Sequence, residues 1–191
     1  RTPEGASIQT TIVPRMQEAA ATALGRQKGA VVALNPKTGA VLALVTSPGY
    51  DPNTLASHDI EKADAAYDAL ASASTRPLSN RAAREIYPPG STFKLVTAAA
   101  ALADGKTPDS KVKSPERLRL PGTSTYLPNS TRCGGTTVTL SRALEVSCNT
   151  AFANVGLEVG EAKLREQAQL FGFDARHLSD LGGVASQFPD S

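Results

Sequence analysis

Tryptophan is absent from this 191-residue sequence, and the usual zinc ligands histidine and cysteine are scarce, with two of each. Zinc sites are usually built from Cys-x-x-Cys or His-x-x-x-His spacings, and neither is present. We therefore expect no metal and no cofactor. Taken alone, Cys133 and Cys148 fit either two unpaired thiols or one disulfide.

An excess of charge of one sign and long hydrophobic runs are lacking as well. The formal net charge is +2, and the basic residues are scattered without interleaved aromatics, so we do not expect nucleic-acid binding. The longest uncharged apolar run, residues 95–103, is about half as long as a membrane span. No signal-like segment opens the sequence. We expect any signal or anchor to lie upstream, outside this chain.

With 40% hydrophobic and 20% charged residues, the composition is that of a globular domain with one core. Pro14 and Gly25 suit the start and end of a helix. The β-rich runs 29–35 and 41–47, joined by Pro36-Lys37-Thr38-Gly39, predict a hairpin with a type I turn and a bulge. Both runs are apolar at nearly every position, which predicts a sheet covered on both faces.

Helices dominate the second half of the sequence. Residues 91–103 are apolar almost all round, which favours a helix inside the domain. Further helices are predicted after Thr139, after Ser147-Cys148-Asn149 as far as about Val159, and over residues 161–171. We therefore predict an α+β fold, with an antiparallel sheet packed against a helix cluster that has a buried central helix.

Between these helices, residues 106–136 form a long irregular stretch rich in Pro, Ser, Thr and Gly. Loops of this length in compact domains are usually functional. A sheet of two strands is only marginally stable. We therefore expect further strands either in this stretch or outside the chain.

The string Ser91-Thr92-Phe93-Lys94 is the first candidate for chemistry. Residues three apart share a helix face, so the Lys94 amine can approach the Ser91 hydroxyl. The preceding Pro-Pro-Gly places Ser91 at a helix N-terminus, which favours an oxyanion. Burial on an apolar helix is expected to lower the pKa of Lys94 and let it act as a neutral base.

The same spacing also arises by chance, and an N-cap serine followed by an ordinary lysine is the simpler reading of any one match. Ser110-Lys111-Val112-Lys113 is a second match in a polar loop, which we interpret as accidental. Ser147-Cys148-Asn149 is the only Ser-x-Asn in the sequence. Serine and asparagine cap helices routinely, so this triplet is informative mainly because it follows a Ser-x-x-Lys.

Together these motifs resemble the transpeptidase domain of a class B penicillin-binding protein, a family that includes the type called penicillin-binding protein A. The similarity runs from about residue 5 to residue 173, and its most specific part is the string of residues 87–94. Other similar segments follow the same order, at residues 10–12, 29–34, 38–43, 48–53 and 77–81. The resemblance implies a β-lactamase/transpeptidase-like fold, with residues 1–191 as the N-terminal portion of the domain.

The resemblance also implies a peptidoglycan D,D-transpeptidase that acts through a serine acyl-enzyme and is inhibited by β-lactams. Ser91 would attack the carbonyl of a D-Ala-D-Ala stem peptide, with Lys94 as its base. Ser147 would relay a proton to the leaving group, and Asn149 would hydrogen-bond the substrate amide. The Ser91 N–H would be one oxyanion donor.

The family has a third motif, Lys-Thr-Gly, on a strand after Ser-x-Asn. The string Lys37-Thr38-Gly39 precedes Ser91 and lies in a predicted turn, so we interpret it as unrelated. We expect the true motif to follow Ser191, outside this chain, and to supply the second oxyanion donor.

A family member works at the extracytoplasmic face of the bacterial membrane, where disulfides persist. We therefore expect a Cys133–Cys148 bridge, which in the chain-entropy model contributes roughly 3 kcal/mol. Membrane association would use a segment absent from this chain. The implied partners are stem peptides, β-lactams as covalent inhibitors, and the cell-division or elongation machinery.

Two other functions stay open, and a third, a histidine-based hydrolase, is disfavoured. A Ser-His-Asp hydrolase needs a histidine base, but His58 and His177 lie in polar surroundings and no Gly-x-Ser-x-Gly occurs. A serine β-lactamase or D,D-carboxypeptidase could use the same serine and lysine. A β-lactamase would need a base for water, for which Glu158, Glu161 and Glu166 are candidates. A β-lactam-binding sensor or interaction domain would keep acylation without turnover.

Overall fold

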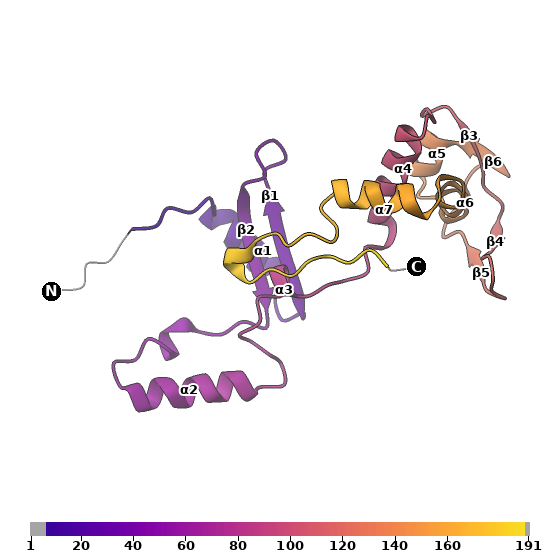
Figure 1. The fold of residues 1–191 in the computed structure, drawn as a ribbon. Coiled ribbons are helices and arrows are strands. Elements are labelled where there is room, and N and C mark those ends of the chain that lie inside the picture. Colours follow the sequence, from indigo (N-terminus) through magenta and orange to yellow (C-terminus); the bar gives the residue numbers. More distant parts are fainter. Residues whose placement is uncertain (1–6, 190–191) are drawn as a thin grey trace. The chain divides into compact units, whose positions relative to one another are not determined.

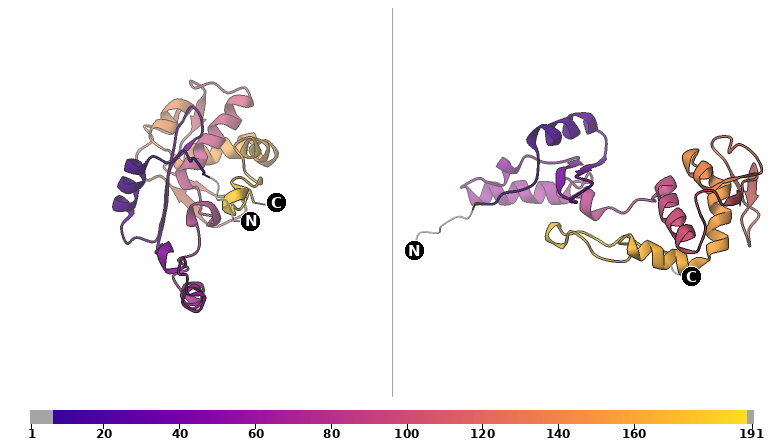
Figure 2. Two further views of the ribbon diagram at one scale, coloured as in Figure 1. Left: turned by 90° about the vertical axis from the view of Figure 1, so that its left-hand side faces the viewer. Right: turned by 90° about the horizontal axis from the view of Figure 1, so that it is seen from above.

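The computed structural model describes residues 7–189, shown as a ribbon in Figures 1 and 2. The chain divides into two compact units. The first contains the described residues up to Glu85 together with Leu178–Val184. The second contains Ile86–His177 and the described residues from Ala185 onward. Helices and antiparallel strands are both present, which confirms the α+β class.

The first unit is built around one β-hairpin. Its elements are α1 (Pro14–Leu24), β1 (Gly29–Leu34), β2 (Val41–Ser47), η1 (Pro52–Thr54), α2 (Ile60–Ser72), α3 (Arg81–Arg84) and η3 (Ser179–Leu181). β1 and β2 pair antiparallel, with an irregularity between Ala33 and Leu34 (Figure 1). The predicted helix and hairpin are therefore confirmed.

The tip of this hairpin contains Lys37-Thr38-Gly39. The Asn35 side chain accepts hydrogen bonds from the N–H groups of Lys37 and Thr38 at 2.9 and 3.2 Å. Gly39 has a φ of 72°, a value that favours glycine. This string therefore lies in a turn, as predicted, and its residues serve the local geometry of the hairpin.

The hairpin is less covered than its sequence predicts. Helix α1 packs on it, and the Gln17 side chain bonds both the N–H and the C=O of Leu44. Of the strand residues only Ala43 is buried, while Val32 and Leu34 are 44% and 56% exposed. The other strand residues are half-buried. The predicted covering of both faces therefore does not hold at Val32 and Leu34.

The second unit contains most of the helices. Its elements are η2 (Gly90–Phe93), α4 (Lys94–Ala103), β3 (Lys111–Lys113), β4 (Arg117–Arg119), β5 (Tyr126–Pro128), β6 (Thr137–Thr139), α5 (Leu140–Glu145), α6 (Asn149–Val159) and α7 (Glu161–Leu170). β3 pairs with β6 and β4 with β5, both antiparallel. The irregular stretch thus does hold strands, but they pair with one another and do not extend the β1–β2 sheet.

Helix α4 lies mostly inside this unit. Its buried residues are Val96, Thr97, Ala98, Ala100 and Ala101. Leu95 and Leu102 are 55% and 46% exposed. The central helix is therefore buried along one side, and two of its leucines stay accessible in the part of the chain that the structure describes.

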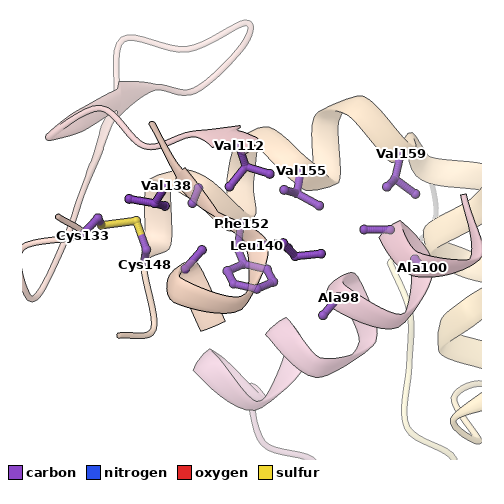
Figure 3. Close-up of a cluster of buried hydrophobic side chains, with 13 residues drawn as sticks. Ala98, Ala100, Val112, Cys133, Val138, Leu140, Cys148, Phe152, Val155 and Val159 are labelled. Carbon is purple, nitrogen blue, oxygen red and sulfur yellow. A yellow bond between two sulfur atoms is a disulfide. The ribbon is translucent and has the colours of Figure 1, made fainter. Parts of the chain in front are cut away.

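One hydrophobic core joins α4, α5, α6, β3 and β6 (Figure 3). Phe152 and Val155 on α6 lie near its middle, and Val112 and Val138 face it from the two short strands. Burying a side chain of this kind contributes about 1.5–3 kcal/mol. The core therefore fixes α4 against α6, whose N-terminal ends hold the candidate chemical groups.

Candidate active site

Ser91 lies in a tight turn immediately before α4. Gly90 has a φ of 55°, and Thr92 donates from its N–H to the Pro89 carbonyl at 3.2 Å. The resulting 3₁₀ turn ends at Phe93, and the α-helix proper begins at Lys94. Ser91 therefore does not occupy the first turn of the α-helix, as the sequence suggested, but the 3₁₀ turn that leads into it.

The amine of Lys94 lies among four oxygen atoms. Its Nζ is 3.2 Å from Ser91 Oγ, 2.9 Å from Ser147 Oγ, 2.7 Å from the Ser147 carbonyl oxygen and 2.6 Å from Asn149 Oδ1. Ser147 Oγ is also 3.1 Å from Ser91 Oγ. The structure thus brings together all four residues that the two motifs single out.

Ser147 reaches this position through an unusual backbone conformation. Its φ is 53°, in the left-handed region that residues other than glycine seldom adopt. Its N–H donates to Leu144 O at 3.0 Å, and the Cys148 N–H donates to Ala143 O at 2.8 Å. The turn between α5 and α6 therefore directs both the carbonyl and the hydroxyl of Ser147 to the same amine.

The orientation of the Asn149 amide is set by a second contact. Its Nδ2 donates to the Pro128 carbonyl at 3.0 Å. Because a carbonyl can only accept, the nitrogen of the amide must face Pro128, and Oδ1 must face Lys94. This assigns the two ends of the amide without ambiguity.

These contacts serve either protonation state of Lys94. The Ser147 carbonyl and Asn149 Oδ1 are obligate acceptors, so they use two N–H bonds of the amine. In the neutral amine, the lone pair can then accept a hydrogen bond from the Ser91 or the Ser147 hydroxyl. In the ammonium form, the third N–H can donate to one of these hydroxyls. Burial lowers the pKa of Lys94 from its usual value of 10.5. The arrangement suits a group that takes a proton from a hydroxyl.

Cys133 and Cys148 form the predicted disulfide. Both are buried, at 5% and 1% exposure, and the bridge lies at one end of the core (Figure 3). Thr131 adds a second link, because its hydroxyl donates to the Val146 carbonyl at 3.0 Å. The loop that contains Cys133 is therefore fastened to the segment that carries Ser147 and Asn149.

The second Ser-x-x-Lys match does not form a site. Ser110 Oγ accepts from the Thr107 N–H at 2.8 Å, in a local turn. Lys113 is exposed on β3 and pairs with Thr137 across the ladder. The interpretation of this match as accidental is consistent with the geometry.

Three of the candidate bases for competing functions contact other groups. Glu158 pairs with Lys106 at 2.8 Å, and Glu161 pairs with Arg165 at 3.2 Å. His177 Nε2 is 3.0 Å from the Gly172 carbonyl. Among residues 7–189, the side-chain hydrogen bonds of Ser91 involve only Lys94 and Ser147.

Neither a metal site nor a membrane span emerges from the described residues. No three His, Cys, Asp or Glu side chains of residues 7–189 come together as metal ligands. Nor does any helix in this range combine the length and hydrophobicity that a bilayer crossing needs.

Sequence reasoning missed a polar cluster behind Asn149. Asn129 hydrogen-bonds Thr150, and both side chains reach the Pro115 carbonyl. Asn129 follows β5 and Thr150 lies in the first turn of α6. Neither residue belongs to a recognisable sequence motif. Only the fold brings these two polar side chains together.

Comparison with known proteins identifies a family. Residues 29–191 match the family model of the penicillin binding protein transpeptidase domain. The peptidoglycan D,D-transpeptidase PbpA of Mycobacterium tuberculosis strain H37Rv is 47% identical over 183 residues, which are 92% of this chain and 37% of that protein. The peptidoglycan D,D-transpeptidase MrdA of Escherichia coli K12 is 35% identical over 170 residues, 88% of this chain and 26% of that protein.

Solved structures of penicillin-binding proteins are similar to this chain as well. The imipenem acyl-enzyme complex of penicillin-binding protein A from M. tuberculosis has a TM-score of 0.88 and 45% identity, over 100% of this chain and 47% of that one. The penicillin G acyl-enzyme complex of the same protein has a TM-score of 0.89 and 44% identity, over 99% and 46%. This chain thus spans less than half the length of the relatives that it matches.

Proposed function

Because the chain belongs to the penicillin-binding protein transpeptidase domain family, we propose that residues 1–191 are the N-terminal portion of a peptidoglycan D,D-transpeptidase domain. The observation that carries this proposal is the convergence of Ser91 Oγ, Lys94 Nζ and Ser147 Oγ within 3.2 Å of one another. A nucleophile, a base and a second hydroxyl in mutual contact are what serine acyl transfer requires.

In the proposed reaction, Ser91 Oγ attacks the carbonyl carbon of the D-alanyl-D-alanine bond, and the neutral Lys94 amine takes the hydroxyl proton. The C–N bond then breaks, and the terminal D-alanine leaves with a proton relayed through Ser147 Oγ. An amine of a second stem peptide attacks the resulting ester, forms the cross-link and frees Ser91. A β-lactam, which mimics the dipeptide, would acylate the same oxygen.

The negative charge that develops on the carbonyl oxygen needs hydrogen-bond donors. The Ser91 N–H donates no hydrogen bond within the described part of the chain, so it is free for this role. Each such donor typically contributes about 3 kcal/mol of transition-state stabilisation. In this proposal the family's Lys-Thr-Gly strand supplies the other donor.

Asn149 has two roles in this proposal. Its Oδ1 holds Lys94, and one hydrogen of its Nδ2 is bound to the Pro128 carbonyl. The second Nδ2 hydrogen is left for a substrate carbonyl. We therefore expect the substrate to accept one hydrogen bond from Asn149, donated by the second Nδ2 hydrogen.

The decisive experiment follows the acyl-enzyme. The purified full-length protein that contains this chain is incubated with a fluorescent penicillin, and the modified residue is identified by peptide mass spectrometry. We expect a long-lived adduct on Ser91, and then release of D-alanine and cross-linking with D-Ala-D-Ala peptides. Rapid deacylation would indicate a β-lactamase, labelling without cross-linking a sensor domain, and transfer to water alone a D,D-carboxypeptidase. An adduct at another residue would refute the assignment.

The family also suggests the setting of the reaction. We expect the domain to act at the extracytoplasmic face of the bacterial membrane, held there by a segment outside this chain. The Cys133–Cys148 bridge supports an oxidising compartment. The cell-division or elongation machinery is the expected protein partner. Localisation of the tagged full-length protein, with protease accessibility from outside the cytoplasmic membrane, would test both expectations.

A further inference from the structure

We propose that Asn129, which matches no motif, is a positioning residue for Asn149 and through it for the Lys94 amine. This inference rests on the proposed function, because its consequence is an effect on acylation. It concerns a side chain that does not itself reach Ser91 in the structure.

The side chain of Asn129 is saturated with contacts. Its Oδ1 accepts from the Thr150 N–H at 3.0 Å. Its Nδ2 lies 3.0 Å from Thr150 Oγ1, 3.0 Å from the Pro115 carbonyl and 3.3 Å from the Glu116 carbonyl. One amide thus joins the end of β5, the segment before β4 and the start of α6.

This amide replaces a missing helix cap. Helix α6 begins at Asn149, and its N-cap residue is Cys148, whose side chain makes no capping bond and is engaged in the disulfide. The first N–H groups of a helix need acceptors. Asn129 Oδ1 supplies one to Thr150 from a distant part of the chain, as an N-cap side chain would.

Burial makes this contact specific. Thr150 is fully buried, and its hydroxyl donates to the Pro115 carbonyl at 2.7 Å. A buried polar group that loses its hydrogen-bond partner destabilises the folded state. The Asn129–Thr150 pair is therefore held in one arrangement, because any shift leaves buried donors or acceptors without partners.

The Asn129–Thr150 contact affects the site through the preceding residues, Pro128 and Asn149. Pro128, which precedes Asn129, offers its carbonyl to Asn149 Nδ2 at 3.0 Å. Asn149, which precedes Thr150, offers Oδ1 to Lys94 at 2.6 Å. The side-chain contact between residues 129 and 150 thus fixes the spacing at which residues 128 and 149 meet, and with it the direction of the Asn149 amide.

The test compares two asparagines in the same unit. Asn129→Ala should reduce the acylation rate constant for a fluorescent penicillin by about 10- to 100-fold, the scale of an ångström-sized misplacement. Affinity before acylation should change little. The matched control is Asn154→Ala, since Asn154 Nδ2 also bonds a backbone carbonyl, that of Lys113, at 3.1 Å. It should acylate within twofold of the wild type.

A double-mutant cycle separates positioning from general destabilisation. In an Asn149→Ala background, Asn129→Ala should cause at most about a threefold further loss, because its route to Lys94 is already removed. Equal losses in both backgrounds would overturn the proposal. So would equal losses from Asn129→Ala and Asn154→Ala.

A milder variant keeps the test valid if Asn129→Ala folds poorly. Asn129→Asp keeps the size and the acceptor for Thr150 but loses both donors, and it should still acylate several-fold more slowly than the wild type. Wild-type rates in this variant would count against the proposal. If the wild-type full-length protein does not acylate, the proposed function fails. The positioning claim is then decided by whether a crystal structure of Asn129→Asp has lost the Asn149–Lys94 contact.

Discussion

The Nζ atom of Lys94 lies 2.6 Å from Oδ1 of Asn149, although 55 residues separate the two in the chain. Asn149 is held at its other end by the Pro128 carbonyl, and Lys94 begins a helix in which residues 96–98 are buried. The amine is therefore placed by the core packing of α4 against α6.

Replacing Ser91 tests the nucleophile. Ser91→Ala should abolish covalent penicillin labelling, because no other described hydroxyl except that of Ser147 contacts the Lys94 amine. The melting temperature should stay within a few degrees, since Ser91 is exposed. Gel fluorescence and intact mass give the readout. Ser110→Ala is the matched control and should label like the wild type, whereas persistent labelling of Ser91→Ala would move the nucleophile elsewhere.

The acylation rate should depend on pH through Lys94. Burial lowers the pKa of this amine below its usual 10.5, so the fraction of neutral base grows as the pH rises through the lowered value. The rate should increase over that interval and then level off. Lys94→Arg, which stays protonated, should lose at least about 100-fold, while Lys113→Arg should be unaffected. A pH-independent rate in the wild type would contradict the assignment of the base.

The same shift should appear in stability. The pKa of Lys94 is lower in the folded state than in the unfolded state, so the unfolded state binds more protons between the two values. The free energy of unfolding contributed by this group must then rise with pH across that interval, up to 10.5. Urea unfolding of the wild type and of Lys94→Met at several alkaline pH values measures it as a difference. A constant difference would contradict the shift.

Removing the disulfide should lower both stability and acylation. The bridge spans 15 residues, and a loop of this size stabilises by about 3 kcal/mol. The double variant Cys133→Ala/Cys148→Ala should lose about that much in denaturant unfolding. Acylation should slow by less than in Asn149→Ala, because Thr131 still ties the loop to Val146. Dithiothreitol-treated wild type serves as a comparison, and unchanged stability in both would disprove the contribution.

Sequence alone predicted the elements with strong local signals. Pro14 and Gly25 bracket a helix that the structure confirms at Pro14–Leu24, and the hairpin has its irregularity at Ala33 and Leu34. Thr139 caps α5 by accepting from the Arg142 N–H, as its position suggested. In each case a residue with restricted backbone or capping chemistry determines the boundary, so the signal is local.

What the sequence could not predict depends on distant contacts. The exposure of Val32 and Leu34 depends on which elements cover the hairpin, and a continuous apolar run does not reveal this. The 3₁₀ turn at Ser91 reads like helix in the sequence. The pairing of Asn129 with Thr150 joins two ordinary polar residues across 21 positions. Motif reading found the groups that meet at Lys94, and packing supplied the residues that hold them.

The left-handed backbone of Ser147 has a consequence for which residues this position accepts. Its φ of 53° suits small or unbranched side chains, whereas a β-branched residue there is strained. Threonine would therefore supply the same hydroxyl but would strain the backbone at this φ. Relief of that strain would move the residue 147 carbonyl away from Lys94, which it now contacts. Replacing Ser147 by threonine is therefore not conservative, although it keeps the hydroxyl, because this position requires both a left-handed backbone and a reactive side chain.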